Sequence, residues 1–226
     1  MNCVYCEKKA TTNDHIPPKG LFSKPYPENM ITVPCCSDCN NLFSKDDQYF
    51  VTMLSLRDDV KNNPTIIANM PKIKRTFQKI EATGFTNKIR SGLHKRNIIT
   101  HSGLLIPNMD AMYYDDKRIL KVVDRILHGL IIGIFNDYDK KQTVIIPIER
   151  IKSTDLKGMN FVFNQLLPAV EKKDVFIVGN GDVFAFQVVR PANNTKSYLW
   201  KMYFYKVVVY LGIAIPEVIK TTNSVL

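Results

Sequence analysis

The fold of this chain is decided near its start, by the segments CVYC (residues 3–6), NDHIPPKG (13–20) and CCSDCN (35–40). The first and last segments each hold a pair of cysteines with two residues between the partners. Two such pairs supply the four thiolates of a tetrahedral zinc site, which can order about forty residues without a large core. We therefore expect a structural zinc ion bound by Cys3, Cys6, Cys36 and Cys39.

The distribution of cysteine supports a local metal site. All five cysteines lie within residues 3–39, whereas a disulfide-stapled secreted protein would spread them through the chain. One cysteine of the adjacent pair Cys35 and Cys36 is in excess of the four ligands. The regular spacing favours Cys36 as the ligand and leaves Cys35 as a small buried residue, or as the alternative ligand.

The composition is that of a water-soluble globular protein. The chain has 226 residues, of which 45% are hydrophobic, and could form one domain or a small module with a larger one. Its longest apolar stretch, residues 127–135, is interrupted by His128 and is too short to span a bilayer. The N-terminus lacks a basic region followed by an apolar run, as a secretory signal would have. We expect a cytoplasmic protein without a membrane partner.

The positive charge is concentrated in one segment. The net charge is +10, yet residues 1–60 carry 6 Lys or Arg against 8 Asp or Glu. Residues 61–100 carry 9 Lys or Arg against Glu81 alone. A basic segment beside a candidate metal site suggests a polyanionic partner, and nucleic acid is the first candidate; the alternative is a solvated helix face. The candidate contacts to a nucleic-acid backbone are Lys72, Lys74, Arg75, Lys88, Arg90, Lys95 and Arg96.

Apolar periodicity predicts three helices. Residues 1–45 are rich in proline and lack such a period, but from Ser37 the apolar residues recur at helical spacing. A helix beginning near Ser37 or Asp38 would carry Cys39 and Asn40 on its first turn. Residues 65–81 read as a second helix, kinked near proline, and residues 116–136 as the strongest helix of the chain.

The rest of the chain predicts strands, and hence an α+β fold class. Strands are expected at residues 98–106, 142–148 and 174–178, with a helix between the last two, and a hairpin at 182–190 and 198–211. The alternating aromatic residues of the last strand suit core packing better than stacking on bases. We thus expect a zinc-stabilised module at residues 1–60 and a larger mixed α+β domain of unknown role at residues 61–226.

The segment between the cysteine pairs contains groups suited to phosphodiester hydrolysis. A histidine with a pKa of about 6.5 can take a proton from water at neutral pH, and His15 is placed to do so. Asp14 and Asn40 offer the hard oxygen ligands that Mg²⁺ or Mn²⁺ prefers. Adjacent residues of a strand point to opposite faces, so we expect Asp14 to hold the metal and His15 to act on the water.

These motifs together resemble the HNH endonuclease family, which has the ββα-metal fold. The resemblance covers residues 1–50 and is closest to the branch with a four-cysteine zinc site, which includes phage junction resolvases of the endonuclease VII type. It implies that Asp14 is a ligand of the catalytic metal and His15 the general base. It further implies that Asn29 orients the histidine and that Asn40 completes the metal site. The four paired cysteines correspond to the structural zinc ligands.

The resemblance predicts a metal-dependent endonuclease, with DNA favoured over RNA as its substrate. Restriction, phage defence and the life of a mobile element would each suit such an enzyme. One alternative is a non-catalytic zinc module that binds nucleic acid or protein. Another is a nuclease effector regulated by the C-terminal domain, through which the chain could also form a homodimer or bind a partner protein.

Overall fold

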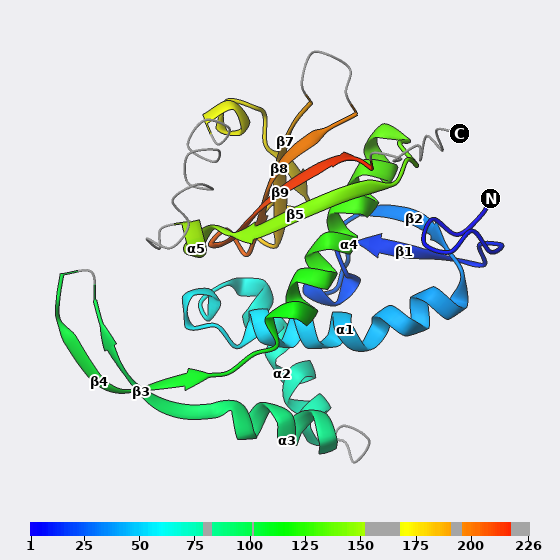
Figure 1. Ribbon diagram of the computed structural model, residues 1–226. Coiled ribbons are helices and arrows are strands. Elements are labelled where there is room, and N and C mark those ends of the chain that lie inside the picture. Colours follow the sequence, from blue (N-terminus) through cyan, green and yellow to red (C-terminus); the bar gives the residue numbers. More distant parts are fainter. Residues whose placement is uncertain (79–82, 101, 152–167, 191–195, 218–226) are drawn as a thin grey trace, which may run out of the picture.

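The computed structural model of the chain describes residues 1–78, 83–100, 102–151, 168–190 and 196–217 (Figure 1). Within these ranges the fold is mixed α+β, which confirms the predicted class. The helices are α1 (Ser37–Ser55), α2 (Pro64–Gln78), α3 (Thr83–Gly92), α4 (Asp116–Phe135) and α5 (Ile148–Ile151), with short 3-10 turns η1 (Lys19–Leu21) and η2 (Asp58–Val60). The strands are β1 (Thr12–Ile16), β2 (Ile31–Cys35), β3 (Leu93–Ile99), β4 (Leu105–Met112), β5 (Lys141–Pro147), β6 (Phe176–Val178), β7 (Phe184–Val189), β8 (Tyr198–Phe204) and β9 (Val208–Pro216).

The N-terminal part is a hairpin followed at once by a helix. Strands β1 and β2 are antiparallel, with Asp14 opposite Val33. Helix α1 begins at Ser37, as predicted, because Cys36 caps it: the Cys36 thiol accepts a hydrogen bond from the backbone N–H of Cys39. The order of these elements is β, β, α, and the predicted zinc ligands lie before β1 and at the start of α1.

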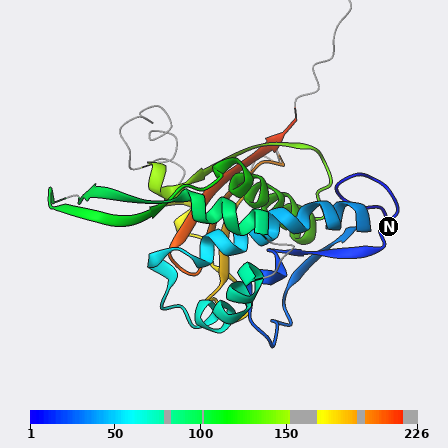
Figure 2. The ribbon, with the colours of Figure 1, turned by 90° about the horizontal axis from the view of Figure 1, so that it is seen from below.

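Helix α4 lies at the centre of the molecule, between the hairpin with α1 and the large sheet (Figures 1 and 2). It matches the predicted helix 116–136, starting after the capping side chain of Asp115 and ending at Asn136, which has a left-handed conformation. Two glycines, Gly129 and Gly133, allow the helix backbone to approach β1 and β2 closely. The hairpin is therefore held against the rest of the chain.

The large sheet has the strand order β5-β9-β8-β7-β6, and every neighbouring pair is antiparallel. Tyr198, Trp200 and Phe204 of β8 are buried, so their predicted role in the core is confirmed. The single strand expected at residues 198–211 is wrong, because Tyr205 and Lys206 have φ of 50° and 67° and turn the chain between β8 and β9. Such angles are unusual for these residue types, and the sequence carries no glycine to signal the turn.

Strands β3 and β4 form a two-stranded arm, residues 93–112, that projects from the body in both ribbon views (Figures 1 and 2). The predicted strand 98–106 is wrong, because these residues cover the end of β3, the turn and the start of β4. Gly103 has a φ of 81° in this turn. The arm exposes large apolar side chains, among them Ile99, Leu104 and Leu105.

Residues from both sides of position 60 share one hydrophobic cluster. It contains Ile16 and Phe50 together with Leu127 and Phe204. The division into domains at residues 60 and 61 stays a prediction. Most of the helix expected between β5 and β6 lies outside the described residues, as do residues 191–195 in the connection of the predicted hairpin. Among the helices that the structure describes, none has the length and apolar character needed to cross a membrane.

Candidate metal centre and active site

Four thiols converge at the predicted zinc site. The Sγ atoms of Cys3, Cys6, Cys36 and Cys39 all lie within 4.8 Å of one another, and those of Cys6 and Cys36 are 3.6 Å apart. A tetrahedral zinc ion with Zn–S bonds of about 2.3 Å requires sulfur atoms about 3.8 Å apart. The cluster could therefore hold a zinc ion, and the preference for Cys36 over Cys35 agrees with this geometry.

The local backbone favours the thiolate form of one thiol of the cluster, Cys3. Although burial opposes ionisation, backbone N–H groups of Tyr5, Cys36 and Cys6 lower the pKa of Cys3 to about 6. Cys35 lies outside the group of four converging thiols; burial raises its pKa to about 12, and its Sγ donates to the carbonyl of Cys36 at 3.3 Å. Cys35 is therefore a protonated, fully buried thiol beside the cluster.

A cleft of about 440 Å³ brings the predicted catalytic residues together. Asp14 and His15 of β1 line it, and Asn40 lines it from the first turn of α1. Lys72 of α2 lines the same cleft, and it is the one of the seven candidate nucleic-acid contacts that does so. Although Asp14 and His15 are neighbours on a strand, both border one cavity.

Asp14 is a buried carboxylate held on one oxygen. Its side chain is 5% exposed, and its Oδ2 accepts a hydrogen bond of 2.7 Å from the hydroxyl of Tyr5. The same oxygen lies 3.6 Å from Nε of Arg125 on α4. Burial, together with the charge of Asp14, raises the pKa of Tyr5 well above its ordinary value, so the phenol keeps its proton and remains a donor.

The protonation of His15 and the hydrogen bonding of Asn40 are compatible with their predicted roles. Burial, helped by the charge of Lys19, lowers the pKa of the half-buried His15 below its ordinary value, which leaves the imidazole neutral at pH 7. Asn40 donates from Nδ2 to Oγ1 of Thr12 at 3.4 Å. This contact commits the amide nitrogen, so the amide oxygen is the atom that Asn40 can offer to a cation.

Asn29 has a different environment from the one predicted. Its Nδ2 donates to the carbonyl of Ile177 at 2.9 Å, and its Oδ1 accepts from the N–H of Gly179 at 2.8 Å. The nitrogen and the oxygen of the amide thus tie the loop after β1 to β6 and to the turn that follows β6. Asn29 is not among the described residues that line the cleft. Its role in orienting His15 stays a prediction, and these contacts give it no support.

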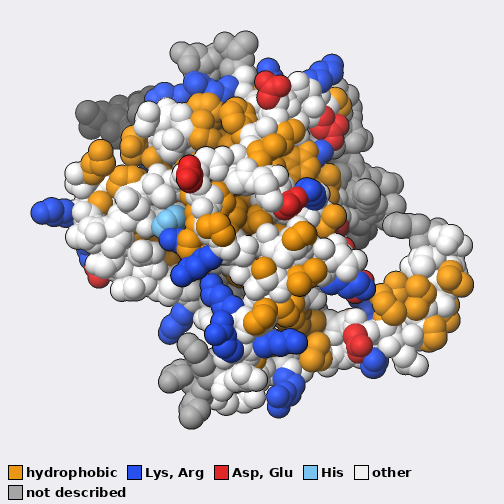
Figure 3. All heavy atoms as spheres, turned by 180° about the vertical axis from the view of Figure 1, so that it is seen from behind, with side chains coloured by type: hydrophobic (Ala, Val, Ile, Leu, Met, Phe, Trp, Pro, Cys, Tyr) orange, Lys and Arg blue, Asp and Glu red, His pale blue; other side chains and the backbone are white. Residues whose placement is uncertain are grey.

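The basic residues are divided among three elements. Lys72, Lys74 and Arg75 are exposed on α2, and Figure 3 shows Lys and Arg side chains gathered over the region of α2 and α3. On α3, Lys88 lies 3.6 Å from Asp115, and Arg90 is exposed. Lys95 and Arg96 are exposed on the arm, where Lys95 pairs with Asp110 at 2.6 Å. The seven candidate contacts are therefore spread over two helices and the arm.

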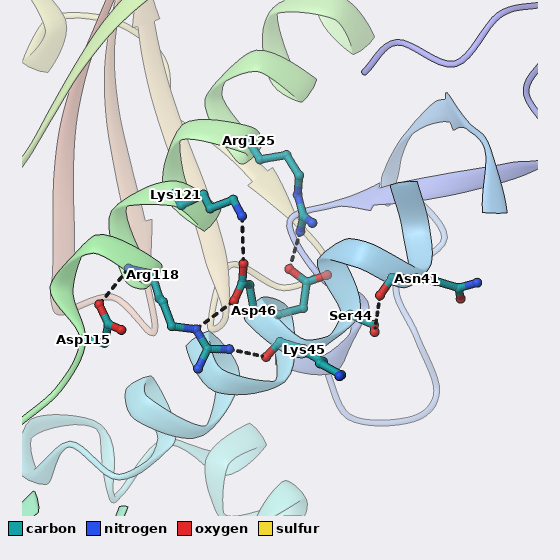
Figure 4. A network of polar contacts seen from close by, with 9 residues as sticks. Asn41, Ser44, Lys45, Asp46, Asp115, Arg118, Lys121 and Arg125 are labelled. Carbon is teal, nitrogen blue, oxygen red and sulfur yellow. Dashed lines mark hydrogen bonds and ion pairs between the residues drawn. The ribbon is translucent and has the colours of Figure 1, made fainter. Parts of the chain in front are cut away.

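Two residues of this region were not predicted, Asp47 and Arg125. Asp47 lines the cleft, and burial raises its pKa to about 6 despite the nearby charge of Arg125. It follows Asn40 by two helical turns, so the periodicity of α1 could have placed both on one face. Arg125 comes from α4, far along the chain, and forms an ion pair with Asp47. Figure 4 shows Arg125 projecting from α4 toward α1.

A second cleft, of about 880 Å³, lies between the arm and the body, and Met53, Phe77, Leu93 and Tyr210 are among its lining residues. No motif of the sequence predicted it. Comparisons of the chain with protein-family models, with curated proteins and with solved structures find no match.

Proposed function

We propose that this chain is a metal-dependent endonuclease of the HNH type that hydrolyses phosphodiester bonds in DNA. One observation carries the proposal: His15, Asp14 and Asn40 line a single cleft. A general base activates the water, and two oxygen donors can hold the metal ion for metal-assisted attack on a phosphodiester. The β1–β2–α1 order and the thiol cluster beside it add support, because both agree with the resemblance of residues 1–50.

In the proposed reaction the neutral imidazole of His15 takes a proton from a water molecule, and the resulting hydroxide attacks the phosphorus atom in line with the leaving 3′-oxygen. The P–O bond to that oxygen then breaks, the 3′-oxygen takes up a proton from water, and the imidazolium of His15 returns its proton to the solvent. Mg²⁺ or Mn²⁺, held by the carboxylate of Asp14 and the amide oxygen of Asn40, would stabilise charge on the phosphate and on the leaving oxygen. Lys72, at the edge of the same cleft, would attract the backbone of the substrate through its charge.

The thiol cluster would serve as a structural zinc site. Four cysteine ligands leave zinc no open coordination position for a substrate. The cluster joins the start of the chain to the first turn of α1, which also carries Asn40. Zinc would thus fix the distance between the strand that carries Asp14 and the helix that carries Asn40. The endonuclease itself would act in restriction, in phage defence or in the life of a mobile element.

Cleavage of a supercoiled plasmid tests the proposal. The zinc-loaded chain should nick or linearise the plasmid with Mg²⁺ or Mn²⁺, and His15→Ala should lower the rate at least 100-fold. His94→Ala is a matched control, because His94 stacks on Tyr113 at the base of the arm and should leave the rate unchanged. Zinc content and melting temperature show that each variant is folded. Equal nicking by wild type and His15→Ala would remove His15 as the base.

The alternatives predict different results. A non-catalytic zinc module would bind nucleic acid or protein but cleave neither DNA nor RNA with either metal. A regulated effector would cleave only when a partner or ligand occupies the rest of the chain. The second cleft and the exposed apolar residues of the arm favour that alternative over a purely supporting role for the C-terminal part.

A further inference from the structure

Arg125 is a buried cation placed between two carboxylates. Its side chain is 8% exposed, it forms an ion pair with Asp47, and its Nε lies 3.6 Å from Oδ2 of Asp14. Nε is one of the buried side-chain atoms that have no hydrogen-bond partner among the described residues. The buried carboxylate of Asp14 and the partly buried carboxylate of Asp47 thus face one guanidinium group. This leaves an excess of one negative charge that a bound cation would offset.

The guanidinium group is fixed in its orientation. It lies over the ring of Phe43, 4.4 Å from the ring centre, and that ring makes an edge contact with Tyr5. Tyr5 in turn donates to Oδ2 of Asp14, the oxygen that Arg125 faces. The four side chains therefore form one packed unit whose polar atoms converge on a single carboxylate oxygen.

Arg125 does not line the cleft, although the two carboxylates that it faces do. Asp14 and Asp47 both line the cleft, whereas Arg125 is not among its described lining residues. Among the contacts that the structure describes, the hydrogen bond and the ion pair of Asp14 both use Oδ2. Its other oxygen, Oδ1, is then the atom that can face a cation in the cleft. Outer contacts of this kind orient a metal-binding carboxylate and tune its affinity.

We propose that Arg125 is a positioning residue that, with Tyr5, fixes Asp14 for a divalent cation, so that α4 completes the metal site of the N-terminal segment. The inference rests on the metal site of the proposed function but not on cleavage of DNA. It makes residues 1–60 insufficient by themselves, because one support of their metal ligand comes from a helix beyond position 115.

The chain offers a matched control for this inference. Arg118, two helical turns before Arg125 on α4, donates from Nε to Asp46 of α1 at 2.8 Å (Figure 4). It joins the same two helices by the same kind of ion pair but does not contact Asp14. A purely structural role of Arg125 predicts similar effects of Arg118→Gln and Arg125→Gln on metal binding.

Direct binding of Mn²⁺ to the full-length, zinc-loaded chain provides the test, with isothermal titration calorimetry as the measurement. The wild type should bind one Mn²⁺ that Asp14→Asn abolishes. Arg125→Gln should weaken this binding by about 10- to 100-fold, and Arg118→Gln by less than twofold. Tyr5→Phe, which keeps the ring but loses the donor to Oδ2, should also weaken it and gives a second reading if Arg125→Gln fails to fold.

The outcomes separate this inference from the proposed function. Equal effects of Arg125→Gln and Arg118→Gln, or unchanged affinity in both Arg125→Gln and Tyr5→Phe, would overturn the role of Arg125. Absence of any Mn²⁺ site that depends on Asp14 would overturn the inference and the proposed catalysis together. Binding of Mn²⁺ that depends on Asp14 and Arg125, without cleavage of any nucleic acid, would uphold the inference and overturn the nuclease.

Discussion

Gly129 of α4 lies directly against Ile16 of β1. A Cβ atom at position 129 would meet Cδ1 of Ile16 at 2.5 Å and its Cγ1 at 2.6 Å, distances that require either the side chain or the helix to move. Ile16 is fully buried and follows His15 in the strand. The contact therefore connects the packing of the central helix to the position of the candidate base.

We expect Gly129→Ala to destabilise the protein. Overpacking of a filled core costs about 1–3 kcal/mol, and the better helix propensity of alanine offsets up to about 1 kcal/mol of this. A net loss of about 1–2 kcal/mol in the free energy of unfolding should appear in urea unfolding curves. Plasmid cleavage should also fall, because a displaced Ile16 moves its neighbour His15.

Gly84→Ala is the control for this substitution. Gly84 lies in α3, and a Cβ atom there would meet nothing within 4 Å. We expect this variant to be as stable as the wild type, or more stable by up to about 1 kcal/mol, since glycine costs conformational entropy in a helix. Similar unfolding curves for Gly129→Ala and Gly84→Ala would contradict the importance of the close contact.

Local chemistry explains which elements the sequence predicts well. The cysteine spacing determines the thiol cluster, and the start of α1 follows because Cys36 is both a cluster thiol and the helix cap. Helix α4 has a clear apolar stripe and a capping residue at each end. Asp14, His15 and Asn40 are close in sequence to this framework, so their convergence in one cleft could be anticipated.

Long-range packing explains what the sequence does not reveal. Arg125 reaches Asp14 only because glycines let α4 approach the hairpin, and no local pattern indicates that register. The turn at Tyr205 depends on a left-handed conformation that neither its residue type nor its neighbour Lys206 favours. The amide of Asn29 is similarly used by backbone groups that lie about 150 residues further along the chain.

Substitution of Cys36 should remove the zinc ion, whereas substitution of Cys35 should leave it bound. Cys36→Ser removes a thiol of the cluster, although serine can still cap α1, so we expect loss of zinc and of the structure that zinc orders in residues 1–40. Cys35→Ser should retain one zinc ion per chain, at a cost in stability of about 1–2 kcal/mol for a hydroxyl at a fully buried position. Metal analysis of the purified proteins, with thermal melting, measures both effects.

A chelator provides an independent check on the same site. If the four thiols hold zinc, a strong chelator should melt the N-terminal segment, and added Zn²⁺ should restore it. Retention of zinc by Cys36→Ser together with its loss from Cys35→Ser would instead show that Cys35 is the ligand.

The stability of the chain should depend on pH through Asp47. Its pKa in the folded state is about 6, above the ordinary value of 3.8, because burial outweighs the attraction of Arg125. A raised pKa means that the folded state binds the proton more tightly than the unfolded state does. Protonation of Asp47 therefore contributes to stability fully below about pH 4, and this contribution is lost as the pH rises through 6. Relative to Asp47→Asn, the wild type should lose about 1.4 kcal/mol between pH 5 and pH 8.

Asp46→Asn is the control for this titration. Burial raises the pKa of Asp46, but the hydrogen bonds from Arg118 and Lys121 outweigh burial and lower that pKa below its ordinary value of 3.8. The contribution of the Asp46 carboxylate to stability is therefore lost only as the pH falls below about 4. Relative to Asp46→Asn, the wild type should therefore show no change between pH 5 and pH 8. Urea unfolding of the three proteins at several pH values measures these differences. A constant difference between the wild type and Asp47→Asn would contradict the raised pKa.

Lys72 should contribute more to DNA binding than Lys95 does. Lys72 borders the cleft that His15 lines, whereas Lys95 is on the arm and is paired with Asp110. Each phosphate contact adds about 0.9 to the slope of log affinity against log salt concentration, so Lys72→Ala should lower the magnitude of that slope by about 1. Lys95→Ala should change it by much less, because its charge is already balanced by a neighbouring carboxylate. Fluorescence anisotropy of a labelled duplex from 50 to 200 mM NaCl measures both slopes, and a larger change for Lys95→Ala would move the binding surface from the cleft to the arm.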